Sequence, residues 1–144
     1  MAFKLVKGFD QSQEMYCATS STVAQGEIIT FDRSAGKIID ATASLLAEDV
    51  AGVVVRTPGA DDTTTMVIPA VPGQLWEWDC TSNTAANQLC KRHVLTDSLT
   101  VANTSTDQAV DEVVVVAIEN VGAAADKKQR GYICGGPHMP GAVS

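Results

Sequence analysis

Hydrophobic and polar residues alternate most clearly in the segment Gln-Leu-Trp-Glu-Trp-Asp-Cys, which ends at Cys80. One set of positions is aromatic or sulfur-containing and the other is largely acidic: Trp76, Trp78 and Cys80 against Leu75, Glu77 and Asp79. Successive side chains of a β-strand point to opposite faces. The pattern therefore predicts a strand over residues 74–80 with one buried face.

Short segments rich in Val, Ile and Thr recur along the rest of the chain and are separated by Gly, Pro, Asn or Asp. Such runs predict strands and turns. The expected strands are Met15–Ser20, Glu27–Asp32, Lys37–Asp40, Val50–Thr57, Thr63–Pro69, Asp111–Val121 and Gln129–Cys134, with a weaker one at Val94–Val101. The turn Arg33–Gly36 predicts a hairpin. The β-branched run in Asp111–Val121 predicts a strand buried on both faces.

One short helix is expected at Thr84–Cys90, with Asn83 as its N-cap. Two stretches, one from Gln25 to Arg56 and one from Gly73 to Glu119, share an order of strands and turns. This similarity favours two β motifs that close into one barrel or sandwich, although short strands and turns also look alike without duplication. The predicted fold class is mainly β.

At 144 residues the chain is long enough for one domain with extended ends. We assign residues 15–134 to a β-domain and residues 135–144, which contain two Pro and three Gly, to an extended C-terminal tail. Residues 1–14 are predicted to be an extended N-terminal arm. The arm is expected to become ordered on a neighbouring subunit and to be dispensable for folding. Its proposed anchors are Phe3, Leu5, Val6 and Phe9. The alternatives are a frayed terminus and an edge strand of the chain's own domain.

Charge and composition exclude some classes of partner. The chain has ten Lys and Arg against 17 Asp and Glu, a net charge of −7. A nucleic-acid surface needs a concentrated positive field, so we expect no nucleic-acid partner. No run approaches the roughly 18 apolar residues of a membrane helix, and the first ten residues lack the apolar core of a secretory signal. We therefore expect no membrane partner and synthesis in a cytoplasm. The four cysteines are expected to be reduced, with a Cys80–Cys90 disulfide as a minor alternative.

The sequence lacks the motifs of common catalytic and cofactor sites. His93 follows two basic residues at the expected helix end, where a solvated or capping role is usual, and His138 lies between prolines. Weak binding of a cation is an alternative for the acidic pair Asp61–Asp62 and for Glu77 and Asp79, but surface carboxylates in loops usually bind only water. We assign no catalytic, cofactor or metal-binding residues.

With the strands laid out, the chain resembles the head decoration, or cement, proteins of tailed bacteriophages. The similarity rests on an Ile-Pro step before a strand ending in Asp-Cys-Thr, a short Ala-containing helix, a Leu-Thr-Asp step and a Val-rich strand before a charged turn. These features span Asp49 to Cys134. The resemblance implies a compact β-tulip or barrel-like domain on the exterior of an icosahedral virion capsid, made in the host cytoplasm.

Proteins of this family bind the major capsid protein, commonly as trimers and sometimes as dimers, and often use an N-terminal arm to bridge capsid subunits. The resemblance therefore implies a structural rather than an enzymatic role. The tryptophans and the four cysteines are not features of that family, but under the cement interpretation we expect Trp76 and Trp78 to lie in the core or at a subunit interface. A protein that binds only the expanded shell stabilises that shell by mass action at many sites.

Two other classes of function compete with this interpretation. A surface-displayed adhesive or carbohydrate-binding β-domain would expose Trp76, Trp78 or Tyr132 as stacking platforms. A small redox enzyme would use Cys80 or Cys90 with a lowered thiol pKa.

Overall fold

The computed structural model describes residues 3–18, 22–41, 49–104 and 114–134. The described residues form eleven strands and two short 3-10 turns. The strands are β1 (Lys4–Lys7), β2 (Gln13–Tyr16), β3 (Ile28–Asp32), β4 (Lys37–Asp40), β5 (Val50–Val54), β6 (Thr64–Pro69), β7 (Leu75–Cys80), β8 (Arg92–Leu95), β9 (Thr100–Ala102), β10 (Val114–Val121) and β11 (Lys128–Cys134). The 3-10 turns are η2 (Ala86–Gln88) and η3 (Ala124–Asp126). The fold is mainly β, as the hydrophobic pattern predicts.

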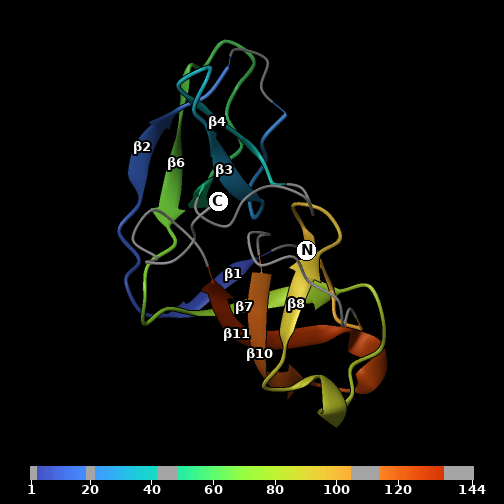
Figure 1. Cartoon of the computed structure of the whole chain (residues 1–144). Helices are drawn as coiled ribbons and strands as arrows, with labels where there is room; N and C mark the ends of the chain where they lie inside the picture. Colours follow the sequence, from blue (N-terminus) through green and yellow to red (C-terminus); the bar gives the residue numbers. More distant parts are fainter. Residues whose placement is uncertain (1–2, 19–21, 42–48, 105–113, 135–144) are drawn as a thin grey trace.

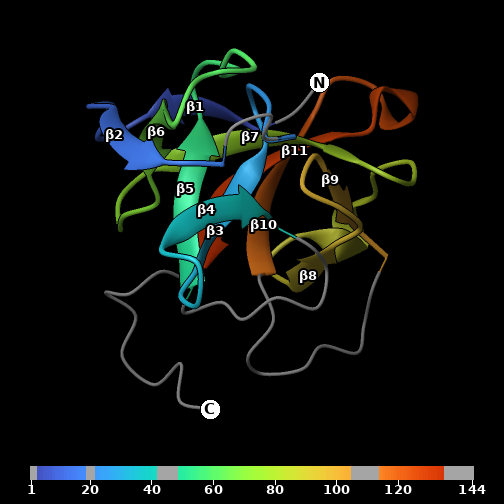
Figure 2. The same cartoon turned by 90° about the horizontal axis from the view of Figure 1, so that it is seen from above.

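The strands make two sheets. Sheet B has the order β2-β6-β5-β3-β4 and comes from the first half of the chain. Sheet A has the order β1-β7-β11-β10-β8-β9 and comes from the second half, except for β1. Figure 1 shows sheet B above and sheet A below, and Figure 2 looks down through sheet B onto sheet A.

Sheet A closes on itself through a parallel pairing of β7 with β9, at Asp79↔Thr100 and Cys80↔Val101. The first part of the same edge of β7 is paired with β1 instead. All other ladders in both sheets are antiparallel. The fold is therefore a small barrel-like ring of strands with a second, curled sheet packed on it.

Two hydrophobic clusters form the core. The larger lies within sheet A and between the sheets, and includes Phe3, Trp76, Trp78, Leu95 and Val115. The smaller lies in the curl of sheet B, around Cys17, Val23, Ile38 and Val67. On β3 and β5, neighbouring residues belong to different clusters, as Ile28 and Ile29 do. β5 and the first three residues of β3 are therefore buried on both faces and join the two cores.

The predicted helix at Thr84–Cys90 is wrong: the segment makes only the 3-10 turn η2. Starting a helix is costly, and two turns recover little of that cost. Polar contacts hold the loop in another shape. The side-chain oxygen of Gln88 accepts hydrogen bonds from the Ala85 amide at 3.1 Å, from Asn103 at 3.0 Å and from Gln129 at 3.0 Å.

Two strand predictions also need correction. The expected strand Val94–Val101 is broken between β8 and β9 by a turn, in which Asp97 accepts hydrogen bonds from the Leu99 amide at 2.8 Å and the Thr100 hydroxyl at 2.7 Å. The Val-rich strand β10 is not buried on both faces, because Ile118 is 39% exposed. The predicted C-terminal tail at residues 135–144 lies outside the described residues.

Candidate docking surface on sheet A

The N-terminal segment is part of sheet A. Lys4 pairs with Glu77 and Leu5 with Trp76, so Leu5 faces the core and is half-buried. The Phe3 ring is buried beside Trp78, with the ring centroids 6.0 Å apart. Phe3 and Leu5 therefore lie against their own domain, as the edge-strand alternative expects. Of the four proposed anchors, only Val6 and Phe9 remain exposed, at 38% and 44%.

A buried amide fixes the chain just after β1. The Gln74 side chain donates to the Phe9 carbonyl at 2.8 Å and the Pro69 carbonyl at 2.9 Å, and its oxygen accepts from the Val71 amide at 2.8 Å. Gly8 has φ +109° and lies against the Gln74 backbone, where a Cβ would come within 2.9 Å of the Gln74 Cα. The backbone that carries the exposed Phe9 is thus held in place before any partner binds.

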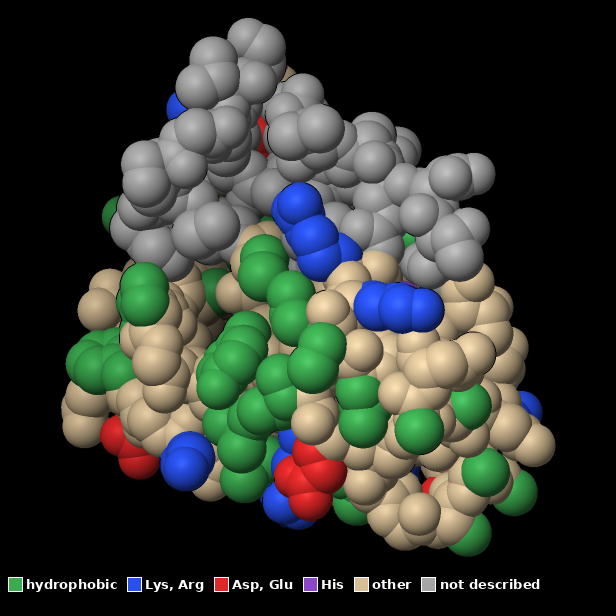
Figure 3. Space-filling model, turned by 60° about the horizontal axis from the view of Figure 1, so that its bottom comes forward, with side chains coloured by type: hydrophobic (Ala, Val, Ile, Leu, Met, Phe, Trp, Pro, Cys, Tyr) green, Lys and Arg blue, Asp and Glu red, His purple; other side chains and the backbone are tan. Residues whose placement is uncertain are grey.

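Hydrophobic residues cross the outward face of sheet A beside this segment. Val116 on β10 pairs with Tyr132 on β11, and the register of β11 with β7 brings Tyr132 next to Leu75. Leu75 in turn pairs with Lys7, next to Val6 in the irregular part of β1. Tyr132 is 44% exposed, and Val116 and Leu75 are half-buried. Figure 3 shows hydrophobic side chains gathered in a band on the bottom of the molecule, where sheet A lies.

Ion pairs form a second row across the same face. Arg130 Nε contacts Glu77 at 3.0 Å and its Nη1 lies 3.9 Å from Glu119, so one arginine links β7 and β10 through β11. Lys128 Nζ contacts Asp79 at 2.6 Å. Burial alone would raise the pKa of Asp79, but hydrogen bonds and nearby positive charges, those of Lys128 among them, keep that pKa below its usual value. The same hydrogen bond raises the pKa of Lys128.

We define the docking surface as Val6, Phe9, Leu75, Val116 and Tyr132, bordered by these ion pairs. Sequence reasoning singled out Val6 and Phe9 but missed the contribution of Tyr132 and Val116 to the same surface. The two come together only through the β10–β11 register, which no short motif encodes. Ordinary surface ion pairs add little stability, so the charged row bears more on the choice of partner than on folding.

The tryptophans do not contribute to this surface. Trp76 and Trp78 are 1% and 0% exposed and lie in the larger cluster. They cannot act as stacking platforms in this fold. Of the three aromatic residues expected to serve an adhesive or carbohydrate-binding role, only Tyr132 is exposed, at 44%.

The cysteines and His93 also lie apart from it. All four cysteines are free. Burial and the nearby charge of Asp79 raise the pKa of the Cys80 thiol to about 12, which leaves it protonated at neutral pH and opposes a role as a nucleophile. Of the two roles expected for His93, the solvated one is wrong, because the side chain is buried. Its Nε2 lies 2.8 Å from the carbonyl oxygen of Gln88, the last residue of η2. His138 lies outside the described residues.

Other classes of site are not apparent in the described parts of the chain. No group of three or more His, Cys, Asp or Glu side chains there could hold a metal ion. A membrane-spanning helix needs about 20 apolar residues, and the helical turns that the structure describes are far shorter.

Comparisons with known proteins do not assign the chain to a family. No protein-family model matches the sequence, and no curated protein matches it either.

Proposed function

We propose that this chain is a structural protein that binds the exterior of an icosahedral phage capsid and stabilises it by bridging major capsid subunits. The observation that carries the proposal is the docking surface, in which Val6 continues a row of exposed and half-exposed hydrophobic residues across a closed sheet and Phe9 is exposed just after β1. Contiguous hydrophobic surface with a polar border is typical of a protein contact site.

The anchoring of this surface also supports a bridging role. A segment that orders only on binding loses conformational entropy at that moment, which weakens the contact. Here Gln74 and the pairing of β1 with β7 already fix the backbone around Val6 and Phe9. A preformed contact of this kind resists forces that separate shell subunits, and many copies act together.

The experiment measures binding of purified protein to expanded shells of the same phage that lack it. We expect Val6→Asp and Phe9→Asp each to weaken binding about tenfold or more, because a carboxylate replaces hydrophobic contact area without disturbing the core. Tyr132→Ser is expected to act in the same direction. Shell-bound protein is quantified by co-sedimentation, and shell stability by the temperature at which packaged DNA is released.

Ile39→Asp is the matched control, because Ile39 is 39% exposed but lies on β4 of sheet B. Binding that is unchanged by all three substitutions on sheet A would contradict the proposed surface. If the unaltered protein did not bind the shells at all, the proposed function itself would be wrong.

A further inference from the structure

A groove of about 630 Å³ opens on sheet B, away from the docking surface. One wall is β2, with Glu14, Met15 and Tyr16, and the other is the β3–β4 hairpin. Within the described residues no ladder joins β2 to β4, so these two strands are the edges of sheet B. The groove therefore lies where the curled sheet fails to close.

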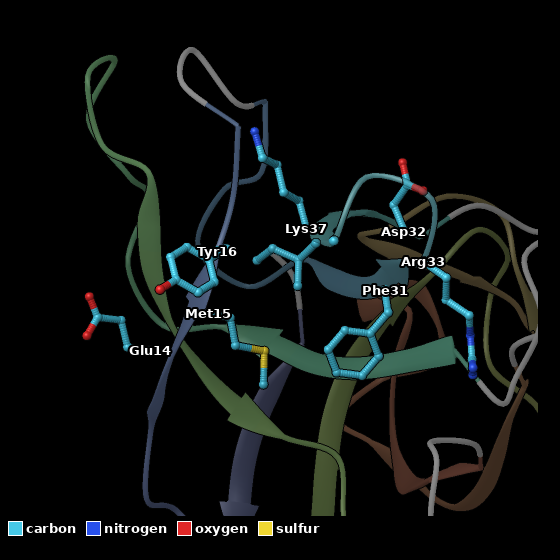
Figure 4. Close-up of a pocket in the computed structure, with 9 residues that line it drawn as sticks. Glu14, Met15, Tyr16, Phe31, Asp32, Arg33 and Lys37 are labelled. Carbon is cyan, nitrogen blue, oxygen red and sulfur yellow. The ribbon is translucent and has the colours of Figure 1, made fainter.

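Hydrophobic side chains occupy the middle of the groove. Tyr16 is 68% exposed and Phe31 is 36% exposed, one on each wall. Between them lie Met15, which is half-buried against the smaller cluster, and the buried Ile38. Figure 4 shows the Tyr16 and Phe31 rings on opposite sides of the opening. An aromatic side chain as exposed as Tyr16 gains free energy when a partner covers it.

The two walls of the groove carry opposite net charges: Glu14 lines the β2 wall, whereas Arg33, Lys37 and Asp32 line the hairpin wall and together carry one positive charge. Glu14 lies beyond Tyr16 at one end, and Arg33 lies beyond Phe31 at the other (Figure 4). Glu14 accepts a hydrogen bond from the Thr64 hydroxyl at 2.8 Å and is exposed. Arg33 donates to Asp49 at 2.6 Å, yet its side chain is 67% exposed. Both groups can therefore contact another molecule without leaving their present partners.

We propose that the groove binds a second copy of this chain in a two-fold symmetric contact. A two-fold contact uses the same patch on both subunits, so the patch must be complementary to itself. The order Glu14, Tyr16, Phe31, Arg33 meets this condition, because half a turn about the middle places each acid opposite the other copy's Arg33. It also places each Tyr16 opposite the other copy's Phe31.

This charge pattern selects a second copy over other occupants. A sugar or an unrelated apolar peptide could cover Tyr16 and Phe31, but neither explains the opposite net charges of the two walls. The trimer that the phage resemblance implies would need a different surface, since a two-fold patch generates pairs. The contact uses sheet B, so it does not depend on shell binding by sheet A.

The test uses a charge exchange, with the dissociation constant of the dimer measured by sedimentation equilibrium up to about 200 µM. Glu14→Lys and Arg33→Glu should each weaken the dimer about tenfold or more, because each places like charges at both ends of the contact. The double variant E14K/R33E restores opposite charges and should return to within about threefold of the unaltered protein. Tyr16→Ser should weaken the dimer without rescue.

Asp61→Lys, in an exposed turn, is the matched control for charge reversal. Circular dichroism and urea unfolding of each variant check the fold, since Arg33→Glu also removes the hydrogen bond to Asp49. Rescue by the double variant supports the proposal and cannot arise from misfolding. A protein that stays monomeric, single reversals without effect, a double variant that stays weak, or a monomer that binds a sugar or peptide in this groove would each overturn it.

Discussion

At the scale of single residues, one glycine allows the aromatic core of sheet A to form. Gly131 on β11 faces the carbonyl of Val116 and the outer edge of the Trp78 ring, and a Cβ built on Gly131 would overlap both. The Trp78 indole therefore fills the space that any other residue at position 131 would occupy. The close approach of three neighbouring strands depends on this missing side chain.

We expect Gly131→Ala to lower the free energy of unfolding by about 1–3 kcal/mol or more, as overpacking of a closely packed core does. Urea unfolding followed by tryptophan fluorescence measures the change. Gly59→Ala is the control, because its nearest neighbour is the end of the Asp62 side chain at 3.3 Å and it should cost within about 0.5 kcal/mol. Equal stability of the two variants would show that the strands around Trp78 can move apart.

The burial of some side chains could be predicted from the sequence, and that of others could not. Alternation identified the buried face of β7, where Trp76, Trp78 and Cys80 are all buried. It could not identify Gln74 and Gln129 as buried amides, because their polarity points to the surface. Their burial depends on partners far away in sequence: Gln74 bonds the Phe9 carbonyl, 65 residues away, and Gln129 bonds Gln88, 41 residues away.

At the scale of elements, a carboxyl group lies at the junction between the two sheets. Glu27 precedes β3 and is 7% exposed. Its carboxylate accepts from the Ser98 hydroxyl at 3.1 Å, and the Ile28 amide donates to the Ser98 carbonyl at 2.9 Å. Burial raises the pKa of Glu27 to about 7, helped by a hydrogen bond to the Asp40 carboxylate and by the negative charges of Asp40 and Asp97.

The raised pKa makes the junction sensitive to pH. Between Glu27's ordinary value near 4.5 and about 7, the folded protein holds a proton that the unfolded chain releases. The free energy of unfolding therefore falls as pH rises through this interval, by at most about 3 kcal/mol. We expect Glu27→Gln to remove this slope, so that the variant gains stability relative to the unaltered protein between pH 5 and pH 8.

Urea midpoints at four pH values across that range measure this effect. Glu119→Gln, which removes an exposed carboxylate on β10, is the control. Parallel pH profiles for Glu27→Gln and the unaltered protein would contradict a proton held at the junction.

The pairing of β1 with β7 changes what truncation should do. Removing residues 1–9 would uncover Trp76 and Trp78 and delete Phe3 from the core. Although the arm interpretation treats this segment as dispensable for folding, the structure leads us to expect a loss of about 3 kcal/mol or more, comparable to the loss of a buried Phe. A thermal unfolding midpoint within about 2 °C of the full-length value would show that β1 contributes little.

Local elements were easier to predict than distant pairings. The β3–β4 hairpin follows from its turn, where Asp32 accepts from the Ser34 hydroxyl at 2.8 Å. The parallel pairing of β7 with β9 has no such local signal, and neither has the pairing of β1 with β7 in sheet A. They depend on which edges remain free once the other strands have paired, and on burying Phe3 and Leu5 against the tryptophans.

At the scale of the whole molecule, the two sheets present different surfaces. Sheet A carries the docking surface proposed to face a capsid, and sheet B carries the groove proposed to pair two copies. The chain has a net charge of −7, and such an acidic balance opposes binding to nucleic acid. The sequence predicted the mainly β class and a barrel-like or sandwich shape, because strands and turns can be identified from residue composition and from the alternation of hydrophobic and polar residues.

The pairing of β1 with β7 also delays the folding of β1 during synthesis. Lys4 is synthesised 73 positions before its partner Glu77 (77 − 4). At typical translation speeds that interval lasts roughly 4–15 s. Throughout it, Phe3 and Leu5 have no core to enter. The nascent chain must therefore keep this hydrophobic segment unpaired until the residues of β7 have been synthesised.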